Sequence, residues 1–298
     1  MTARTLDYPL GRSLIPALLL RRRRVVPAGA QLYAQINDQV RPDQVIAEAQ
    51  DQGAVTRILA GLAGRVVETQ PGQSVTIEGT ATLLQGVVGV GEPVAGPLAF
   101  LPHGESLAVV PIPRGAIIVY PHRAPLTLFQ RAAVGGAVGV IASSASALEF
   151  EAFARADLTL FFDGLTPTLT HFPLTVLLTE GLGDTPMDQG IFQLLLQRAN
   201  DVALLTGHTQ PRLNQRPELL LPLPLGAPTV RTPLDNALTI GAYVAVIAGP
   251  QRGARGQLLY LFGHQQPGPA GLWAHSALVR LDSGATLTQP LSALDRIG

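Results

Sequence analysis

The sequence predicts a protein of the class α/β plus β, with a β module, then a small α/β domain, then a second β module. The 298 residues are 47% apolar and only 14% charged, which provides apolar material for several cores. The 31 glycines and 25 prolines are scattered, as short strands joined by turns require. The apolar pattern has period two near both ends, whereas strand-like and helix-like segments alternate in the middle. The predicted parts are an N-terminal arm over 1–24 and modules over 25–105, 110–225 and 229–298.

The absence of lysine and of cysteine excludes several kinds of chemistry. All 21 basic residues are arginine, so no lysine exists to form a Schiff base or to carry covalent biotin or lipoate. The chain has no cysteine, which excludes disulfides and thiolate metal sites and is typical of a reducing, cytoplasmic location. The formal net charge of zero is not the global signature of a nucleic-acid binder. Because neither lysine nor cysteine is present to attach or ligate a cofactor, we expect none.

The N-terminal arm combines an apolar stretch with a run of charge. The stretch from Leu14 to Leu20 is short, contains Pro16 and precedes Arg21 to Arg24, which reverses the order of a secretory signal. It is also far below the roughly 20 apolar residues of a membrane helix. We interpret the four arginines as part of a solvated arm, and contact with an anionic membrane or with RNA is the alternative.

Short strands separated by turns fill the module over 25–105. Period-two strands are expected over 64–68 and 71–78. The string from Ile36 to Ala47 resembles a half-motif of biotinyl/lipoyl-like barrel-sandwich proteins, and especially the unmodified module near the start of RnfC-type electron-transport subunits. The resemblance implies a barrel-sandwich-like fold, but no electron transfer, because the cysteines that hold clusters are absent. The Gly-rich stretch over 86–91 is predicted as a strand with close backbone approach or a bulge.

Buried strands alternate with helices in the module over 110–225. The alternation predicts a small α/β domain with a mostly parallel sheet, in which ligands bind beyond the carboxyl ends of the strands. We expect Ser143-Ser144 to cap the second helix and Thr185-Pro186 to begin the third. Strands are predicted over 115–120, 137–142, 158–162, 173–179 and 202–206, with helices over 126–134, 145–155 and 185–200. Gly135-Gly136 is expected to end the first of these helices.

Two loops at such strand ends carry the candidate small-ligand residues. The hydroxyls of Ser143 and Ser144 beside a helix N-terminus would hold an anion, and Glu180 or Asp184 would act as a base. Ordinary capping and turn chemistry explains the same residues, and we favour it. Of the six histidines, only His208 follows a strand beside other polar residues, and no two histidines have metal-ligand spacing. We therefore expect no metal site.

The same module resembles an uncharacterised bacterial family in two strings. One is a strand followed by T-E-G-F-G-x-x-P-M and a helix, which here is Thr179 to Met187. The other is a G-x-T-Q string followed by R-P-E and an apolar run that ends in proline, which here is Gly207 to Gln210 with Arg216 to Pro222. The resemblance implies architecture and carries no activity.

After the proline-rich linker over 222–228, the last module consists of short strands around a tight turn. An alternating strand from Gly241 leads into the G-P-x-x-G-x-x-G turn over 249–256 and a returning strand. This pattern resembles the KOW motif, and five short strands fit an SH3-like barrel. KOW modules in NusG-type elongation factors and ribosomal proteins contact RNA or protein, so the resemblance implies a partner surface with arginines for phosphate and aromatic rings for stacking. The residues expected there are Gly249, Arg252, Gly253, Arg255, Gly256, Tyr243 and Trp273.

Three functions are compatible with these patterns. We favour a non-enzymatic scaffold or adaptor that docks a protein partner through its β modules. A factor associated with RNA, ribosomes or transcription, acting through the KOW-like turn, is the alternative. The third is an enzyme with a site in the Glu180–Asp184 loop, and it requires a pocket there and a carboxylate with a raised pKa.

Overall fold

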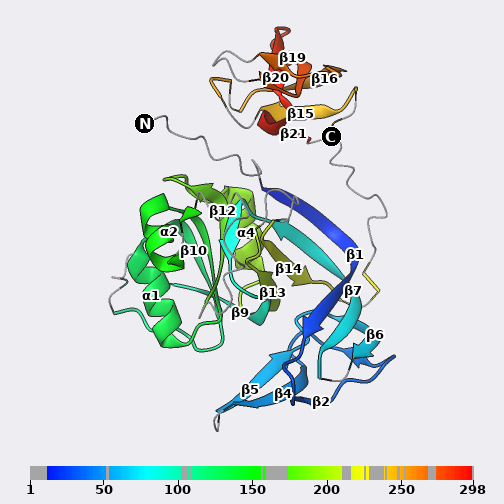
Figure 1. Cartoon of the computed structure of the whole chain (residues 1–298), viewed down its shortest axis with the longest axis vertical. Coiled ribbons are helices and arrows are strands. Elements are labelled where there is room, and N and C mark those ends of the chain that lie inside the picture. The colour runs from blue at the N-terminus through cyan, green and yellow to red at the C-terminus, as the bar shows by residue number, and fades with distance from the viewer. Residues whose placement is uncertain are drawn as a thin grey trace. The chain divides into compact units, whose positions relative to one another are not determined.

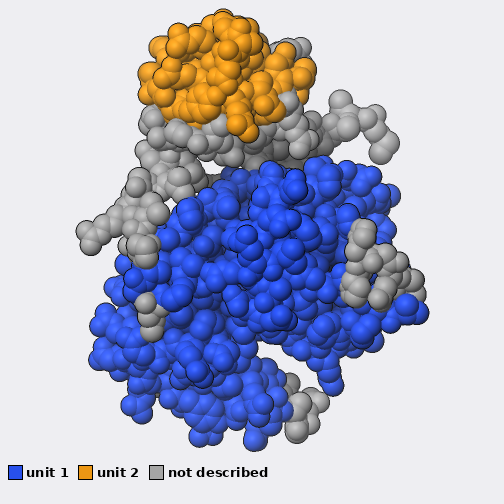
Figure 2. All heavy atoms as spheres, turned by 180° about the vertical axis from the view of Figure 1, so that it is seen from behind, with its two compact units in different colours: residues 1–8, 12–231 blue, residues 9–11, 232–298 orange. Residues whose placement is uncertain are grey.

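The computed structural model is mostly β and forms two compact units (Figures 1 and 2). Unit 1 extends to Arg231, and unit 2 runs from Thr232 to Gly298, apart from a few residues near the N-terminus. The structure describes residues 12–51, 54–70, 72–101, 107, 109–155, 157–158, 174–209, 216–224, 226–227, 238, 240–246, 249–251, 253–267 and 273–296.

The first part of unit 1 is built around the long antiparallel pair β1–β7. These strands pair along the whole of β1, with a bulge between Ile15 and Leu18. The segment interpreted from sequence as a solvated arm is therefore largely a strand of the sheet, with Leu18 and Leu20 packed against the core. The strands of this part are β1 (Ser13–Val25), β2 (Gln31–Leu32), β3 (Gln39–Val40), β4 (Val45–Asp51), β5 (Ala54–Leu59), β6 (Gly64–Gln70) and β7 (Ser74–Gln85).

One large mixed sheet joins this part to the rest of unit 1. Its order is β3-β6-β7-β14-β13-β9-β10-β11-β12-β8, with β1 beside β7, while β2, β4 and β5 form a separate three-stranded sheet. Only the neighbours from β9 to β12 are parallel, so the sheet is mixed where the sequence predicted a mostly parallel one. The further strands are β8 (Val88–Val90), β9 (Val94–Phe100), β10 (Ile117–Ala124), β11 (Gly139–Ala145), β12 (Thr175–Leu182), β13 (Val202–Thr206) and β14 (Glu218–Pro222).

Helices cover both faces of the parallel strands because the strands are apolar on both sides. On one face, Ile118 and Val140 pack with α1 (Leu126–Gly135) and α2 (Ala147–Ala154). On the other, Ile117 and Ile141 pack with α4 (Gln189–Gln197). Figure 1 shows α1 and α2 together beside β10, with α4 apart from them. The continuous apolar runs in the sequence therefore reflect burial on two faces.

Local sequence signals predicted the end of α1 correctly, but they misplaced the starts of α2 and α4. α1 ends at Gly136, which is left-handed (φ 80°) and donates to the last carbonyls of the helix, as predicted. The capping role predicted for Ser143-Ser144 is wrong, because β11 continues through both residues and Ser146 is the N-cap of α2. Asp188, rather than Thr185, caps α4. Most of the strand predicted over 158–162 lies outside the described residues.

Close backbone contacts explain the Gly-rich stretch over 86–91. A Cβ atom on Gly89 would lie 2.4 Å from the carbonyl oxygen of Val176, so only glycine lets β8 approach β12 at this point. Thr209 holds the same glycine from the other side, because its hydroxyl accepts from the Gly89 N–H at 2.8 Å. The predicted close approach is thus confirmed.

Unit 2 is a small antiparallel β structure. Its five-stranded sheet has the order β20-β19-β16-β15-β21, and β17 and β18 form a separate two-stranded ribbon. The core contains Val244, Val246, Leu258 and Val279, which alternate with exposed residues along their strands. The elements are β15 (Tyr243–Val246), β16 (Arg255–Leu261), β17 (Gln266–Pro267), β18 (Trp273–Ala274), β19 (Ser276–Leu281), β20 (Thr286–Pro290), the 3-10 helix η2 (Leu291–Ala293) and β21 (Leu294–Arg296).

Candidate functional site

The loop from β12 to α4 uses its carboxylates for internal contacts. The Glu180 side chain is only 6% exposed and forms an ion pair with Arg12. Its other oxygen accepts the Asp188 backbone N–H at 3.2 Å. Asp188 in turn pairs with Arg12 at 2.9 Å and caps α4 by accepting the Ile191 N–H at 3.1 Å. Asp184 is exposed on the loop. Glu180 is therefore an anchor for the chain near β1, and its position is not that of an open catalytic base.

The two serines predicted as anion ligands are buried inside β11. Ser143 and Ser144 are both fully buried. The Ser144 hydroxyl donates to the Thr185 carbonyl at 3.0 Å, and the two serine hydroxyls lie 3.5 Å apart. Since β11 extends past both residues, the Ser144 side chain binds the β12–α4 loop instead of a helix N-terminus, and the Ser143 hydroxyl lies beside that of Ser144. This arrangement favours the structural interpretation of the serines.

His208 lies at the opposite end of the sheet from Glu180. Its Nε2 atom is buried without a hydrogen-bond partner and stands 3.4 Å from a carboxylate oxygen of Glu92. The Glu92 backbone is held at the first residue of β12, where Thr175 donates to its carbonyl at 2.6 Å. Glu180 is five strand residues further on, roughly 16 Å away along β12. The structure therefore separates two of the predicted small-ligand residues. Within the described residues, no group of three His, Cys, Asp or Glu side chains has a metal-binding arrangement.

The arginines of the run in β1 form ion pairs or hydrogen bonds with other residues of the chain. The Nε atom of Arg21 lies 2.7 Å from a carboxylate oxygen of Glu78, and Arg22 forms an ion pair with Glu218. Arg24 points inward and is 5% exposed. These contacts leave less positive charge for a membrane or RNA than the sequence indicated.

Arg24 is a buried cation held by carbonyl oxygens. Its Nε donates to the Leu59 carbonyl at 3.3 Å, and an Nη atom lies 3.5 Å from the Pro93 carbonyl. Burial lowers the pKa of Arg24 to about 10 because the interior disfavours the charged form. The side chain thus links β1 to the end of β5 and to the turn between β8 and β9.

In unit 2, part of the predicted partner surface forms one outward face. Tyr243 on β15 lies opposite Gln257 on β16, which lies opposite Arg280 on β19, and the Arg280 guanidinium donates to Gln257 at 3.1 Å. Arg255 is exposed on the same face. The Tyr243 hydroxyl donates to Asp282, and this hydrogen bond is the main cause that raises the pKa of Tyr243.

The glycines of the KOW-like turn have backbone roles. Gly249 and Gly253 are left-handed, with φ of 82° and 91°, and the Gly253 N–H donates to the Val246 carbonyl at 2.7 Å. Gly256 is buried, and a Cβ atom there would lie 2.2 Å from the Arg280 carbonyl oxygen. The structure thus gives this glycine a role in strand packing, and its role in partner contact stays a prediction. Arg252 lies outside the described residues.

Trp273 lies away from the turn. It sits on the β17–β18 ribbon, which connects the end of β16 to the start of β19, whereas the turn lies at the other end of β16, roughly 20 Å away. Trp273 is 66% exposed, and Tyr260 is 52% exposed with its ring 5.2 Å from that of Phe262. We call Tyr260, Phe262 and Trp273 the aromatic end of unit 2. Sequence reasoning missed Tyr260, because period two would bury it with Leu258, but a bulge between the two reverses its direction.

Comparison with known proteins gives no relative. No family model matches the chain, and no curated protein or solved structure matches it significantly. Among the described residues, the helices are too short or too polar to cross a membrane.

Proposed function

We propose that this chain is a non-enzymatic scaffold or adaptor that docks a protein partner through its β modules, mainly through the aromatic end of unit 2. The observation that carries the proposal is the exposure of two large aromatic side chains, Tyr260, whose ring contacts Phe262, and Trp273 on the β17–β18 ribbon. Exposed tryptophan and tyrosine side chains dominate the binding energy of many protein interfaces. By contrast, Glu180 and the two serines of β11 are engaged within the chain, so the enzyme hypothesis loses its expected site.

The proposal includes an interpretation of the fold. The strand order of unit 2, with η2 between β20 and β21, supports an SH3-like barrel of the KOW type. The parallel strands β9 to β12 with helices on both faces support a small α/β domain, and the β1–β7 region supports a barrel-sandwich-like module. Membership of the uncharacterised bacterial family and a cytoplasmic location belong to the same proposal, and the lack of cysteine supports the location.

Affinity capture with matched variants tests the adaptor proposal. Tagged full-length protein is used to capture partners from its own cells, with and without RNase, and the captured proteins are identified by mass spectrometry. A defined protein should survive RNase and decrease about tenfold or more with Trp273→Ala. Leu148→Ala, which removes an exposed leucine of α2, should leave capture unchanged. Equal capture by both variants would contradict the role of the aromatic end.

RNA binding through the outward face of unit 2 is the second candidate. Arg255 and Arg280 are exposed beside Tyr243 on this face, which favours phosphate contact next to a ring, although Asp282 offsets part of the charge. Single-stranded RNA should then bind with a steep salt dependence that Arg255→Ala/Arg280→Ala removes. Arg41→Ala, at an arginine whose side chain is 80% exposed in unit 1, is the control. No RNA binding at low salt rejects this candidate.

A further inference from the structure

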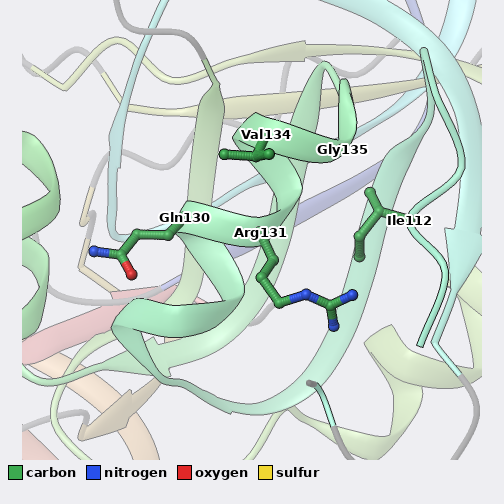
Figure 3. Close-up of a pocket in the computed structure, with 5 residues that line it drawn as sticks. All are labelled: Ile112, Gln130, Arg131, Val134 and Gly135. Carbon is green, nitrogen blue, oxygen red and sulfur yellow. The ribbon is translucent and has the colours of Figure 1, made fainter. Parts of the chain in front are cut away.

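The end of helix α1 borders a shallow hollow with an apolar floor. The hollow has a volume of about 290 Å³ and is lined by Ile112, Gln130, Arg131, Val134 and Gly135 (Figure 3). Val134 is 90% exposed, although it is apolar. Ile112 packs directly against Gly135, where a Cβ atom would lie only 2.6 Å from the Ile112 Cβ. Because glycine has no side chain, it leaves Ile112 uncovered on this side. We call this feature the α1 hollow.

Two arginines stand beside the α1 hollow, and neither has a carboxylate partner among the residues that the structure describes. Arg131 donates to the Val110 carbonyl at 2.8 Å, and Figure 3 shows its side chain extending from α1 toward the segment that carries Ile112. Arg114 is exposed and lies over the end of α1, with its Nε 3.2 Å from the position that a Cβ atom of Gly136 would occupy. The ion pairs found among the described residues include neither arginine.

The size of the α1 hollow determines what kind of ligand fits. Sites that enclose small molecules have volumes of roughly 300–1,000 Å³ and bury most of the ligand. The α1 hollow is at the lower limit of this range, and the described residues that line it come from α1 and the segment at Ile112. It therefore accommodates one side chain of a larger partner better than a whole small molecule.

The chemistry of the lining determines the character of that partner. Exposed apolar surface favours an apolar side chain, and arginines at its border that pair with no described carboxylate favour adjacent negative charge. We propose that the α1 hollow docks an apolar side chain flanked by acidic residues on a partner protein. The site lies on unit 1 and does not depend on the aromatic end of unit 2. A single anchor of this size gives weak binding, with a Kd on the order of 0.1–1 mM.

Methyl NMR on the full-length chain tests the proposal with defined probes. The probes are acetylated eight-residue peptides with a central leucine flanked by glutamate, by glutamine or by arginine. The glutamate-flanked peptide should shift the methyl signals of Ile112 and Val134 in a saturable way. The glutamine-flanked peptide should bind at least about tenfold more weakly, because it lacks the charge that Arg114 and Arg131 attract. Equal binding of all three peptides, or no shift at Ile112, overturns the proposal.

Variants locate the binding and distinguish other occupants. Val134→Asp changes an exposed side chain, so it should fold normally and weaken the glutamate-flanked peptide at least about tenfold. Arg131→Ala should weaken it similarly. Leu148→Asp places the same charge on α2, where the leucine is 77% exposed and outside the hollow, and should bind as the wild type does. If instead the wild-type chain dimerises in light scattering and Val134→Asp abolishes the dimer, the occupant is a second copy and the proposal fails.

Discussion

Two groups of arginines in unit 1 differ in what surrounds them. At β1, Arg12 and Arg21 each meet a carboxylate, on Glu180 and Glu78 respectively. At the α1 hollow, Arg114 and Arg131 meet no carboxylate among the described residues. A cation paired within its own chain offers little to a ligand, whereas an unpaired cation beside apolar surface keeps its attraction. The run of arginines that is most prominent in the sequence is therefore the less available of the two groups.

The largest effect that separates the two groups should come from Arg12. We expect Arg12→Ala to lower the free energy of unfolding of unit 1 by about 2–3 kcal/mol, because it leaves the buried Glu180 carboxylate without its cation. Arg114→Ala, at an exposed arginine that forms no ion pair with a described residue, should change it by no more than about 0.5 kcal/mol. Urea denaturation followed by far-UV circular dichroism measures both, since the single tryptophan lies in unit 2.

A double-mutant cycle checks the cause of the Arg12 effect. If the ion pair is responsible, Arg12→Ala should cost much less when Glu180 is already alanine. Equal losses in the free energy of unfolding from Arg12→Ala and Arg114→Ala would show that the two groups of arginines do not differ in their pairing.

Arg24 is a third case, in which an arginine is neither paired with a carboxylate nor available to a ligand. Burial lowers its pKa to about 10 in the folded chain, below the ordinary value of an arginine in the unfolded chain. Burial of this charge therefore opposes folding at neutral pH, and the penalty is relieved only as the pH rises through the folded pKa of about 10 toward the ordinary arginine value. We expect Arg24→Met, which keeps the apolar volume, to leave stability within about 1 kcal/mol of the wild type or to raise it.

The matched variant for this prediction is Arg24→Ala. It removes the charge and also the packed side chain, so it should cost about 2 kcal/mol. Urea denaturation at pH 7 compares the two variants. If Arg24→Met lost as much stability as Arg24→Ala, the hydrogen bonds to the Leu59 and Pro93 carbonyls would outweigh the cost of burying the arginine charge.

Features set by neighbouring residues could be predicted from the sequence. The bounds of β13 agree with the predicted 202–206, and Gly136 ends α1 through its left-handed conformation. Both depend on local apolar spacing or on the freedom of glycine, which a sequence displays directly. The predicted close approach at Gly89 is also of this kind.

The candidate site depended on contacts between distant residues, which no local pattern contains. Glu180 pairs with a residue 168 positions away, and Ser144 binds a carbonyl 41 positions away. Because of those contacts, the loop that the sequence predicted as a ligand site instead binds other segments of the chain. The bulge that exposes Tyr260 and the contact of Gly135 with Ile112 likewise depend on packing between segments. Sequence periodicity predicts which side chains are buried only while the strand stays regular.

The smallest effect should come from Arg21, whose side chain is exposed. Its hydrogen bond to Glu78 is the main cause that lowers the pKa of that carboxyl, and the nearby Arg65 adds to the shift. Arg21→Ala should therefore raise the pKa of Glu78 toward 4.5, as seen in a carbon-13 NMR titration of the carboxyl. Because the folded pKa is lowered, the stability that the pair contributes is present above pH 4.5 and is lost as the pH falls through the folded pKa. Arg23→Ala, two residues further along β1 and bonded to Gln70, should leave the titration unchanged. An unchanged titration in Arg21→Ala would instead assign the effect to Arg65.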